Sequence, residues 1–409
     1  MSELRNPAVR TRSRGEVAVM AVYASITAYI AADQLLSMFL PSTLIRIFEL
    51  VCLGVMVWYT LKIWTYGETP RYRGWPLVLI FLLAACNLFI IIRGNYGGGL
   101  KDMVLLKFSY LQIPAYILPF AILLLPNRKY INAILEVLFF SMLLVIPIWL
   151  LHLLDLVRDS FYGEALGVYL PFFGALLILF RKKLNMRRQL VVFAIYGFYF
   201  ILMLLNARRN MVVSLSLFFV VAFIMGNVTR FKTDMRSRLL LLGAVAGAVA
   251  LIIANWGVLS STVFDRILYR GLEDTRSGVE LTFLSDMASS PVQDWIWGRG
   301  LDGAYENMKQ DPVTLEFNYD RSVIETGYLY LLLKGGLMYV LLILSFLFTA
   351  FFRGISFKKP LLTGMALFLL IYLLDMYMTN PVSFFAVKTV IFWLIVSICL
   401  QYREKVVRK

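Results

Sequence analysis

The 409-residue chain is poor in charge: Asp, Glu, Lys and Arg make up only 16% of it, against about 25% in an ordinary soluble domain. Hydrophobic residues make up 60%, and the mean hydropathy is +0.76. A chain of this composition cannot expose most of its surface to water, which excludes a water-soluble globular fold. The polar stretches are too short for a separate soluble domain, with one exception described below.

Cysteine and histidine are equally scarce. The three cysteines, Cys52, Cys86 and Cys399, all lie within apolar runs and lack metal-ligand spacing, so we expect them only to pack. The single histidine, His152, is expected to pack or to form a hydrogen bond. HExxH and DxD patterns and a phosphate-binding glycine loop are also missing, and Gly97–Gly99 is interpreted as a flexible turn. The sequence therefore predicts no metal site and no cofactor.

Apolar runs of about 20 residues, the length that crosses a bilayer core, recur along the whole chain. The first follows four arginines, as in a signal peptide, but it is longer and lacks a small-residue cleavage site, so we interpret it as a retained span. The predicted spans are 17–40, 44–64, 75–92, 108–125, 131–153, 166–180, 189–205, 211–226, 239–256, 324–352, 361–379 and 380–402. The prediction is an all-α polytopic protein of about twelve transmembrane helices, with residues 1–409 forming one integral membrane domain.

Basic residues alternate from one side of the predicted spans to the other. Every second connection, together with the two termini, holds 25 of the 40 Lys and Arg residues. The positive-inside rule assigns that side, with both termini, to the cytoplasm. The formal net charge of +15 therefore reflects membrane topology and gives no reason to expect a nucleic-acid partner.

One predicted outer connection, residues 257–325, is far longer than the others. It contains 12 acidic and six basic residues. Loops of this length are usually functional or partly ordered. Apolar residues at helical spacing predict a short helix over 279–289, and Trp297–Gly303 has the glycine content of a turn.

Several ionisable residues fall inside the spans or at their outer rims: Asp33, Arg46, Glu49, Arg208, Arg209, Lys334, Asp375 and Lys388. Glu136 is an exception on the inner side. Charge at bilayer depth usually faces a partner or a polar cavity, so the set favours a cavity that opens outward. The alternative is that Lys334 and Lys388 snorkel to the interface and that Asp375 caps a helix or forms an ion pair.

Arg208 and Arg209 occupy a tight turn at 206–210, on the side where arginine is disfavoured. Paired guanidinium groups can grip a phosphate or pyrophosphate in bidentate fashion. The alternative ligand is the headgroup of an outer-leaflet phospholipid.

Three stretches together resemble the Wzy/O-antigen ligase superfamily of bacterial membrane enzymes. They are Asn206–Leu215, Arg276 with Trp295–Tyr305, and Glu325–Leu342. The resemblance implies a GT-C-like bundle with a large periplasmic loop in the bacterial inner membrane. It also implies an enzyme that polymerises undecaprenyl-pyrophosphate-linked repeat units of O-antigen, capsule or exopolysaccharide. Its partners would be the lipid-linked donor and acceptor, membrane lipids, a chain-length regulator and a flippase.

The resemblance assigns the pyrophosphate to Arg209 and Arg276, with Arg208 beside them. Such cations would stabilise the departing pyrophosphate, and Glu325 is the best-placed carboxylate to accept the proton of the acceptor hydroxyl. Asp302, Asp320 and Asp375 are weaker candidates for this base. The residues expected to bind substrate are Arg208, Arg299, Arg321, Tyr328, Lys334, Trp297 and Asp375. The aromatic residues of the loop could instead be interfacial anchors.

The chain departs from the superfamily at one position. Ligases usually carry histidine where this chain has Glu325, and residues 257–325 contain no histidine at all. The departure favours a polymerase over the alternative, a ligase that transfers finished glycan to a lipid acceptor. A transporter or flippase for lipid or polysaccharide, without covalent chemistry, is the third hypothesis.

Overall fold

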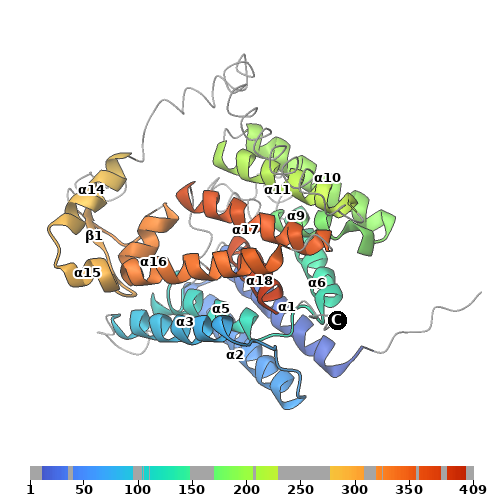
Figure 1. Cartoon of the computed structure of the whole chain (residues 1–409), viewed down its shortest axis with the longest axis horizontal. Coiled ribbons are helices and arrows are strands. Elements are labelled where there is room, and N and C mark those ends of the chain that lie inside the picture. Colours follow the sequence, from blue (N-terminus) through green and yellow to red (C-terminus); the bar gives the residue numbers. More distant parts are fainter. Residues whose placement is uncertain are drawn as a thin grey trace, which may run out of the picture.

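The computed structural model is a helical bundle with a small lobe at one end (Figure 1). It describes the chain except for residues 1–11, 36–39, 95–103, 105, 110, 148–169, 206–208, 229–276, 308–318, 325, 356–358, 379–384 and 402–409. The bundle comprises α1 (Arg14–Leu35), α2 (Ser42–Thr65), α3 (Trp75–Ile92), α5 (Ile113–Leu123), α6 (Ile131–Leu143), α9 (Phe172–Leu179), the 3₁₀ turn η2 (Arg181–Lys183), α10 (Met186–Leu205), α11 (Arg209–Asn227), α16 (Gly327–Gly354), α17 (Pro360–Met378) and α18 (Val387–Leu400). The lobe comprises α14 (Ser277–Ala288), α15 (Val292–Trp297), β1 (Tyr305–Asn307) and β2 (Tyr319–Arg321).

Helices occupy the predicted apolar spans wherever the structure describes them. In the described part of the chain, α1, α2, α3, α16 and α17 are long and apolar enough to cross a membrane. Shorter apolar helices occupy most of the other spans, and span 239–256 lies outside the described residues. The chain is therefore an all-α membrane protein, while the number of crossings and the GT-C-like arrangement stay predictions.

Helix α18 is the centre of the bundle. Every one of its residues is buried, and it packs against α5, α9, α16 and α17. A helix that is apolar on all sides is stable only when neighbours enclose it. Helices α2 and α3 instead expose large apolar side chains, including Trp58 (58%), Phe81 (67%) and Ile92 (66%), as helices facing lipid do.

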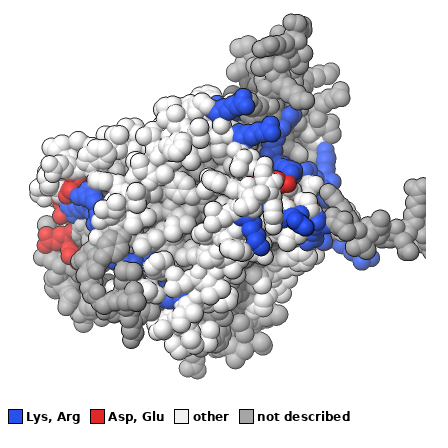
Figure 2. All heavy atoms as spheres, turned by 90° about the horizontal axis from the view of Figure 1, so that it is seen from below, with Lys and Arg blue, Asp and Glu red and all other residues white. Residues whose placement is uncertain are grey.

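The bundle has two chemically different ends. Figure 2 shows Lys and Arg gathered toward one end, a broad face without charge, and a smaller mixed group at the other end. At the first, which we term the basic end, Lys129 contacts Glu68 (2.8 Å) and Lys183 donates to Asn132 (2.8 Å), so connections far apart in sequence meet. The opposite end carries α14, α15 and the β-hairpin, and we term it the loop end.

The lobe has a core of its own. Antiparallel strands β1 and β2 pair Tyr305 with Arg321. Phe283 and Met287 of α14 pack with Tyr305 and with Leu333 of α16. The short helix predicted over 279–289 is confirmed by α14.

Candidate functional site at the loop end

Helix α16 is broken at Gly336, which has φ 68° and ψ −171°. At this break, the amides of Arg299 and Gly300 donate to the carbonyl oxygens of Leu333 (2.7 Å) and Lys334 (3.0 Å). A continuous helix would use those carbonyls in its own hydrogen-bond ladder. The turn between α15 and β1 therefore docks into the helix as a replacement partner.

Two glycines make this docking possible. A Cβ atom on Gly298 would lie 2.5 Å from the amide nitrogen of Gly336, and a Cβ on Gly336 would lie 2.5 Å from the amide nitrogen of Gly298. Both residues have positive φ, which disfavours any side chain. Two of the stretches that carry the family resemblance, 295–305 and 325–342, thus interlock backbone to backbone.

Lys334 fixes the turn from the helix side. Its side chain is almost fully buried, and Nζ donates to the carbonyl oxygens of Leu301 (2.9 Å) and Gly303 (2.8 Å). The neighbouring Asp302 forms an ion pair with Lys107. The ammonium group does not snorkel to solvent. It holds the turn on α16, and its predicted contact with substrate stays a prediction.

Arg299 is surrounded by acceptors of the lobe. Nη2 lies 2.6 Å from Asp286 Oδ2 and 2.5 Å from Ser290 Oγ, and Nε lies 3.4 Å from Asp294 Oδ2. Nη1 donates to the carbonyl of Ala304 (2.5 Å). The guanidinium therefore ties α14, α15 and the start of β1 together, and two carboxylates already compensate the charge that was predicted to bind substrate.

The remaining predicted residues of the lobe lie at its surface. Trp297 is 43% exposed, and its ring centroid lies 5.6 Å from that of Phe89 on α3. Arg321 is partly exposed on β2. An exposed indole beside the bundle is compatible with sugar stacking and with an interfacial anchor, so both interpretations of Trp297 stay open.

A second cluster, a buried ion pair with a hydroxyl partner, joins α11, α17 and α18. Lys388 Nζ lies 2.9 Å from Asp375 Oδ2, and Ser214 Oγ donates to Asp375 Oδ1 (2.8 Å). The Lys388 ammonium also lies 4.7 Å from the centroid of the Phe172 ring. All three polar side chains are at most 4% exposed. Asp375 and Lys388 thus pair with each other, which agrees with the ion-pair alternative for Asp375.

The other ionisable residues predicted within spans also have partners. Arg46 pairs with Glu49 within α2 (2.5 Å), and Glu136 pairs with Arg12 at the basic end (2.9 Å). The described members of the set thus contact one another or backbone carbonyls. The outward-opening polar cavity that they suggested stays a prediction.

Helix α11 connects the buried ion pair to the predicted pyrophosphate site. Arg209 is its first residue, and Ser214 lies five residues later. At 1.5 Å per residue the backbone of Arg209 is about 7.5 Å further toward the loop end. From α16, Tyr328 donates its hydroxyl to the carbonyl of Leu373 on α17 (2.7 Å), close to Asp375. The ends of α11, α16 and α17 therefore adjoin.

A hydrogen bond joins the starts of α14 and α16, which follow the other two predicted catalytic residues in the sequence. Thr326 Oγ1 donates to the carboxylate of Glu280 in the first turn of α14. Glu325 directly precedes this threonine, and Arg276 directly precedes α14. The contact therefore brings the two chain segments together. Arg208, Arg276, Glu325 and His152 lie outside the described residues, as does the side chain of Arg209.

Helix ends of both directions meet at the loop end. Helices α11, α16 and α18 all begin there, as the contacts of Ser214, Tyr328 and Lys388 show. Backbone N–H groups of a first helical turn lack intrahelical acceptors and favour anions. Helices α3, α10 and α17 end at the same end of the bundle, and the carbonyl groups of their last turns carry the opposite partial charge. The helix directions therefore give no net positive potential there.

An apolar pocket of about 410 Å³ lies between α10 and α11, along the helices that the 206–210 turn connects. Its lining consists of Phe193, Tyr196, Gly197, Phe200, Ser216, Phe219 and Val220. Within the described residues, no group of three or more His, Cys, Asp or Glu could hold a metal ion.

Sequence reasoning missed Arg93, Lys107, Ser214 and Glu280. Arg93 donates to the carbonyl of Gly298 and contacts Asp294 (3.5 Å), so it ties α3 to the lobe. A signal for Arg93 and Lys107 was available, because both belong to the minority of basic residues on the predicted outer side. Ser214 and Glu280 had no such signal, because each acts through a partner that is distant in sequence.

Comparison with known protein families, with curated proteins and with solved structures finds no significant match to this chain. The geometry and the composition establish the class, an all-α protein with apolar helices that can cross a membrane.

Proposed function

We propose that this chain is a membrane glycosyltransferase that joins lipid-pyrophosphate-linked oligosaccharide repeat units on the face of the membrane at its loop end. The observation that carries the proposal is a series of contacts at this end that links three segments, from α14 to α16, from α16 to α17 and from α17 to α11. They are the start of α11 with Arg209, the start of α14 after Arg276, and the start of α16 after Glu325. These are the segments on which the family resemblance is based.

The proposed reaction breaks the bond between the donor sugar's anomeric carbon and the pyrophosphate oxygen. A hydroxyl of the acceptor glycan attacks that carbon, and Glu325 accepts the hydroxyl proton. The pyrophosphate leaves with the electron pair of the broken bond, and Arg209 and Arg276 compensate its charge in a water-poor site. No nucleotide sugar takes part.

The other observations fit a lipid-linked substrate. The apolar pocket between α10 and α11 suits the polyprenyl tail, because it lies on the same hairpin as Arg209. The interlocked 297–303 turn and α16 support the starts of α14 and α16, which follow Arg276 and Glu325 in the sequence, as a preorganised site requires.

A transporter is the second candidate, and the buried Asp375–Lys388 pair favours it. Ionisable residues within spans often mark a substrate or ion path. Transport predicts movement of the lipid-linked unit without a new glycosidic bond, so one assay distinguishes the two functions.

That assay uses the purified full-length chain in proteoliposomes with the lipid-linked repeat units that accumulate in cells lacking it. A ladder of longer lipid-linked glycans on a gel is the expected product. Arg209→Ala and Arg276→Ala should each lower polymer formation by at least about 100-fold, the scale of losing one oxyanion-stabilising group. Arg187→Ala at the basic end is the matched control and should polymerise normally.

The proposal fails if both loop-end variants make full-length polymer, or if the wild-type chain moves the substrate without forming bonds. Transfer of finished polymer to a different lipid acceptor, with no elongation of single repeats, would identify a ligase.

A further inference from the structure

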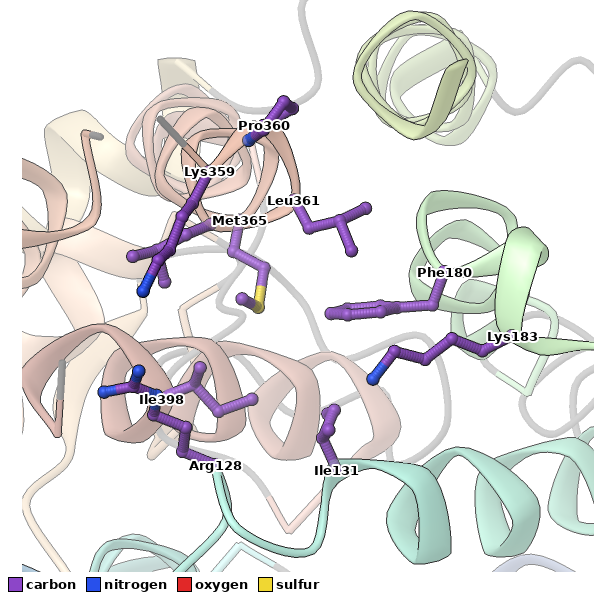
Figure 3. A pocket seen from close by; sticks show the side chains of 10 residues that line it. Arg128, Ile131, Phe180, Lys183, Lys359, Pro360, Leu361, Met365 and Ile398 are labelled. Atoms are coloured by element: carbon purple, nitrogen blue, oxygen red, sulfur yellow. The ribbon is translucent and has the colours of Figure 1, made fainter. Parts of the chain in front are cut away.

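A second cavity, of about 360 Å³, lies at the basic end of the bundle (Figure 3). It is lined from four directions: the turn before α6, the α9–η2 turn, the start of α17 and the end of α18. The lining residues are Arg128, Ile131, Phe180, Lys183, Lys359, Pro360, Leu361, Leu362, Met365 and Ile398. The proposed reaction takes place at the opposite end of the bundle and does not use this cavity.

The lining divides into an apolar floor and a cationic rim. Phe180, Met365 and Ile398 are buried, whereas Arg128, Lys183 and Lys359 are exposed. Figure 3 shows Lys183 reaching in from η2, while Arg128 and Lys359 approach from the other side of the view. None of the ten lining residues is acidic.

Helix ends of both directions border this cavity. Helices α6 and α17 both begin there, at Ile131 and Pro360. Their first-turn N–H groups carry partial positive charge, but α9 and α18 end at the same cavity, and the carbonyl groups of their last turns carry the opposite partial charge. The positive potential of the cavity therefore comes from its side chains. Lys183 Nζ donates to the neutral Asn132 Oδ1 (2.8 Å), a bond that brings no opposite charge to the ammonium group.

We propose that this cavity binds one anionic phospholipid from the adjoining leaflet, with the phosphate at the Arg128, Lys183 and Lys359 rim and an acyl chain on the apolar floor. A free phosphate would leave the floor empty, and a zwitterionic lipid would bring a cation next to three others. Basic pockets between transmembrane helices on the positive side of a membrane suit anionic headgroups. Lysine stems can pack on apolar surface while the ammonium contacts the headgroup.

The alternative is that the three cations are simply part of the general excess of Lys and Arg at this end. Lys182 and Arg187 provide the comparison, because they are exposed at the same end without lining the cavity. A specific site requires that only the lining cations matter.

The test uses the purified full-length chain in mild detergent. Thermal unfolding is followed while phosphatidylglycerol, phosphatidylcholine or inorganic phosphate is titrated, and native mass spectrometry counts bound lipid. We expect phosphatidylglycerol to raise the unfolding midpoint with saturation at one bound lipid, and the other two additives to raise it little. Equal stabilisation by phosphatidylcholine, or full stabilisation by phosphate alone, would overturn the proposal.

Substitutions of lining and non-lining residues test whether the lipid binds in this cavity. Lys183→Gln with Lys359→Gln should weaken phosphatidylglycerol binding roughly tenfold or more, while Lys182→Gln with Arg187→Gln should bind as wild type. Because all four positions are exposed, folding should persist, and the unfolding curve without lipid checks this.

Leu361→Trp, at a half-buried position, should obstruct the acyl chain and lower lipid binding with every charge intact. If the lining and control pairs respond alike, the site is refuted.

Discussion

Individual residues at the loop end act mainly through backbone geometry and paired charge. Gly298 and Gly336 permit two backbones to touch, and Lys334 and Arg299 hold the lobe in place through carbonyl and carboxylate acceptors. The buried Asp375–Lys388 pair links three helices. Each arrangement predicts a distinct result for a single substitution.

Replacing Gly336 with alanine should destabilise the protein by about 2 kcal/mol or more, because a non-glycine residue with positive φ is strained and the added methyl meets the backbone of Gly298. Thermal unfolding in detergent measures the loss, and faster proteolysis of the lobe should accompany it. Gly54→Ala is the matched control, since a Cβ there meets nothing within 4 Å. Equal stability of both variants would mean that the lobe does not dock on the α16 break.

The Asp375–Lys388 pair should behave as a coupled unit. Asp375→Asn or Lys388→Met alone should cost about 3–5 kcal/mol, because each leaves an uncompensated buried charge. The double variant should recover much of that loss, and a double-mutant cycle on unfolding free energies measures the coupling. Additive losses would show that the two charges do not interact. If the double variant still polymerises glycan, the pair is structural; if stability recovers and polymerisation is lost, the pair serves the reaction.

At the scale of elements, hydrogen bonds between chain connections fix how the helices are arranged. The connection after α2 contacts the start of α6 through Glu68, which accepts from Lys129 and Tyr130. The same end has Asn127 donating to Ser397 of α18 (2.8 Å). At the loop end, carbonyl groups at the break in α16 accept hydrogen bonds from the 297–303 turn and so fix the lobe on the bundle.

The Glu68 contact predicts a pH dependence. Burial raises the pKa of Glu68, but the hydrogen bonds from Lys129 and Tyr130 outweigh it, so the net pKa lies below its ordinary value of 4.5. A lowered carboxyl pKa contributes stability above that ordinary value, and the contribution is lost as pH falls through the folded-state pKa. Because Lys129 is 58% exposed, we expect the contact between Glu68 and Lys129 to contribute under about 1 kcal/mol to the free energy of unfolding.

Unfolding midpoints measured from pH 7 down to pH 3 test this expectation. Wild type should lose more stability than Glu68→Gln over the acid part of the range, and the two should converge there. Parallel curves would show that Glu68 carries no pH-dependent stabilisation.

At the scale of the whole molecule, the segregation of charge predicts a fixed orientation. The basic end and the loop end lie on opposite sides of an uncharged face (Figure 2). The positive-inside rule then directs the loop end outward. The proposed reaction requires that orientation, because its donor would be presented on the outer face.

Cysteine labelling in spheroplasts measures the orientation. In a chain with Cys52, Cys86 and Cys399 replaced by alanine, Val292→Cys on α15 should react with a membrane-impermeant maleimide from outside. Met186→Cys at the basic end should react only after permeabilisation. Both positions are well exposed, at 70% and 67%, so access to solvent within the protein is comparable. The reverse pattern would rule out the outward-facing reaction.

The amino-acid sequence by itself determined the helical membrane class, the apolar helices that the structure describes, the helix in the lobe and the alternation of basic connections. These features follow from local apolar periodicity and from charge near span ends, which need no long-range contact. Tertiary structure alone decided that Gly298 meets Gly336, that Ser214 and Lys388 share Asp375, that Arg299 is compensated by Asp286 and Asp294, and that three distant cations border one cavity. Such pairings depend on which helices adjoin, and a single sequence carries no local signal for that.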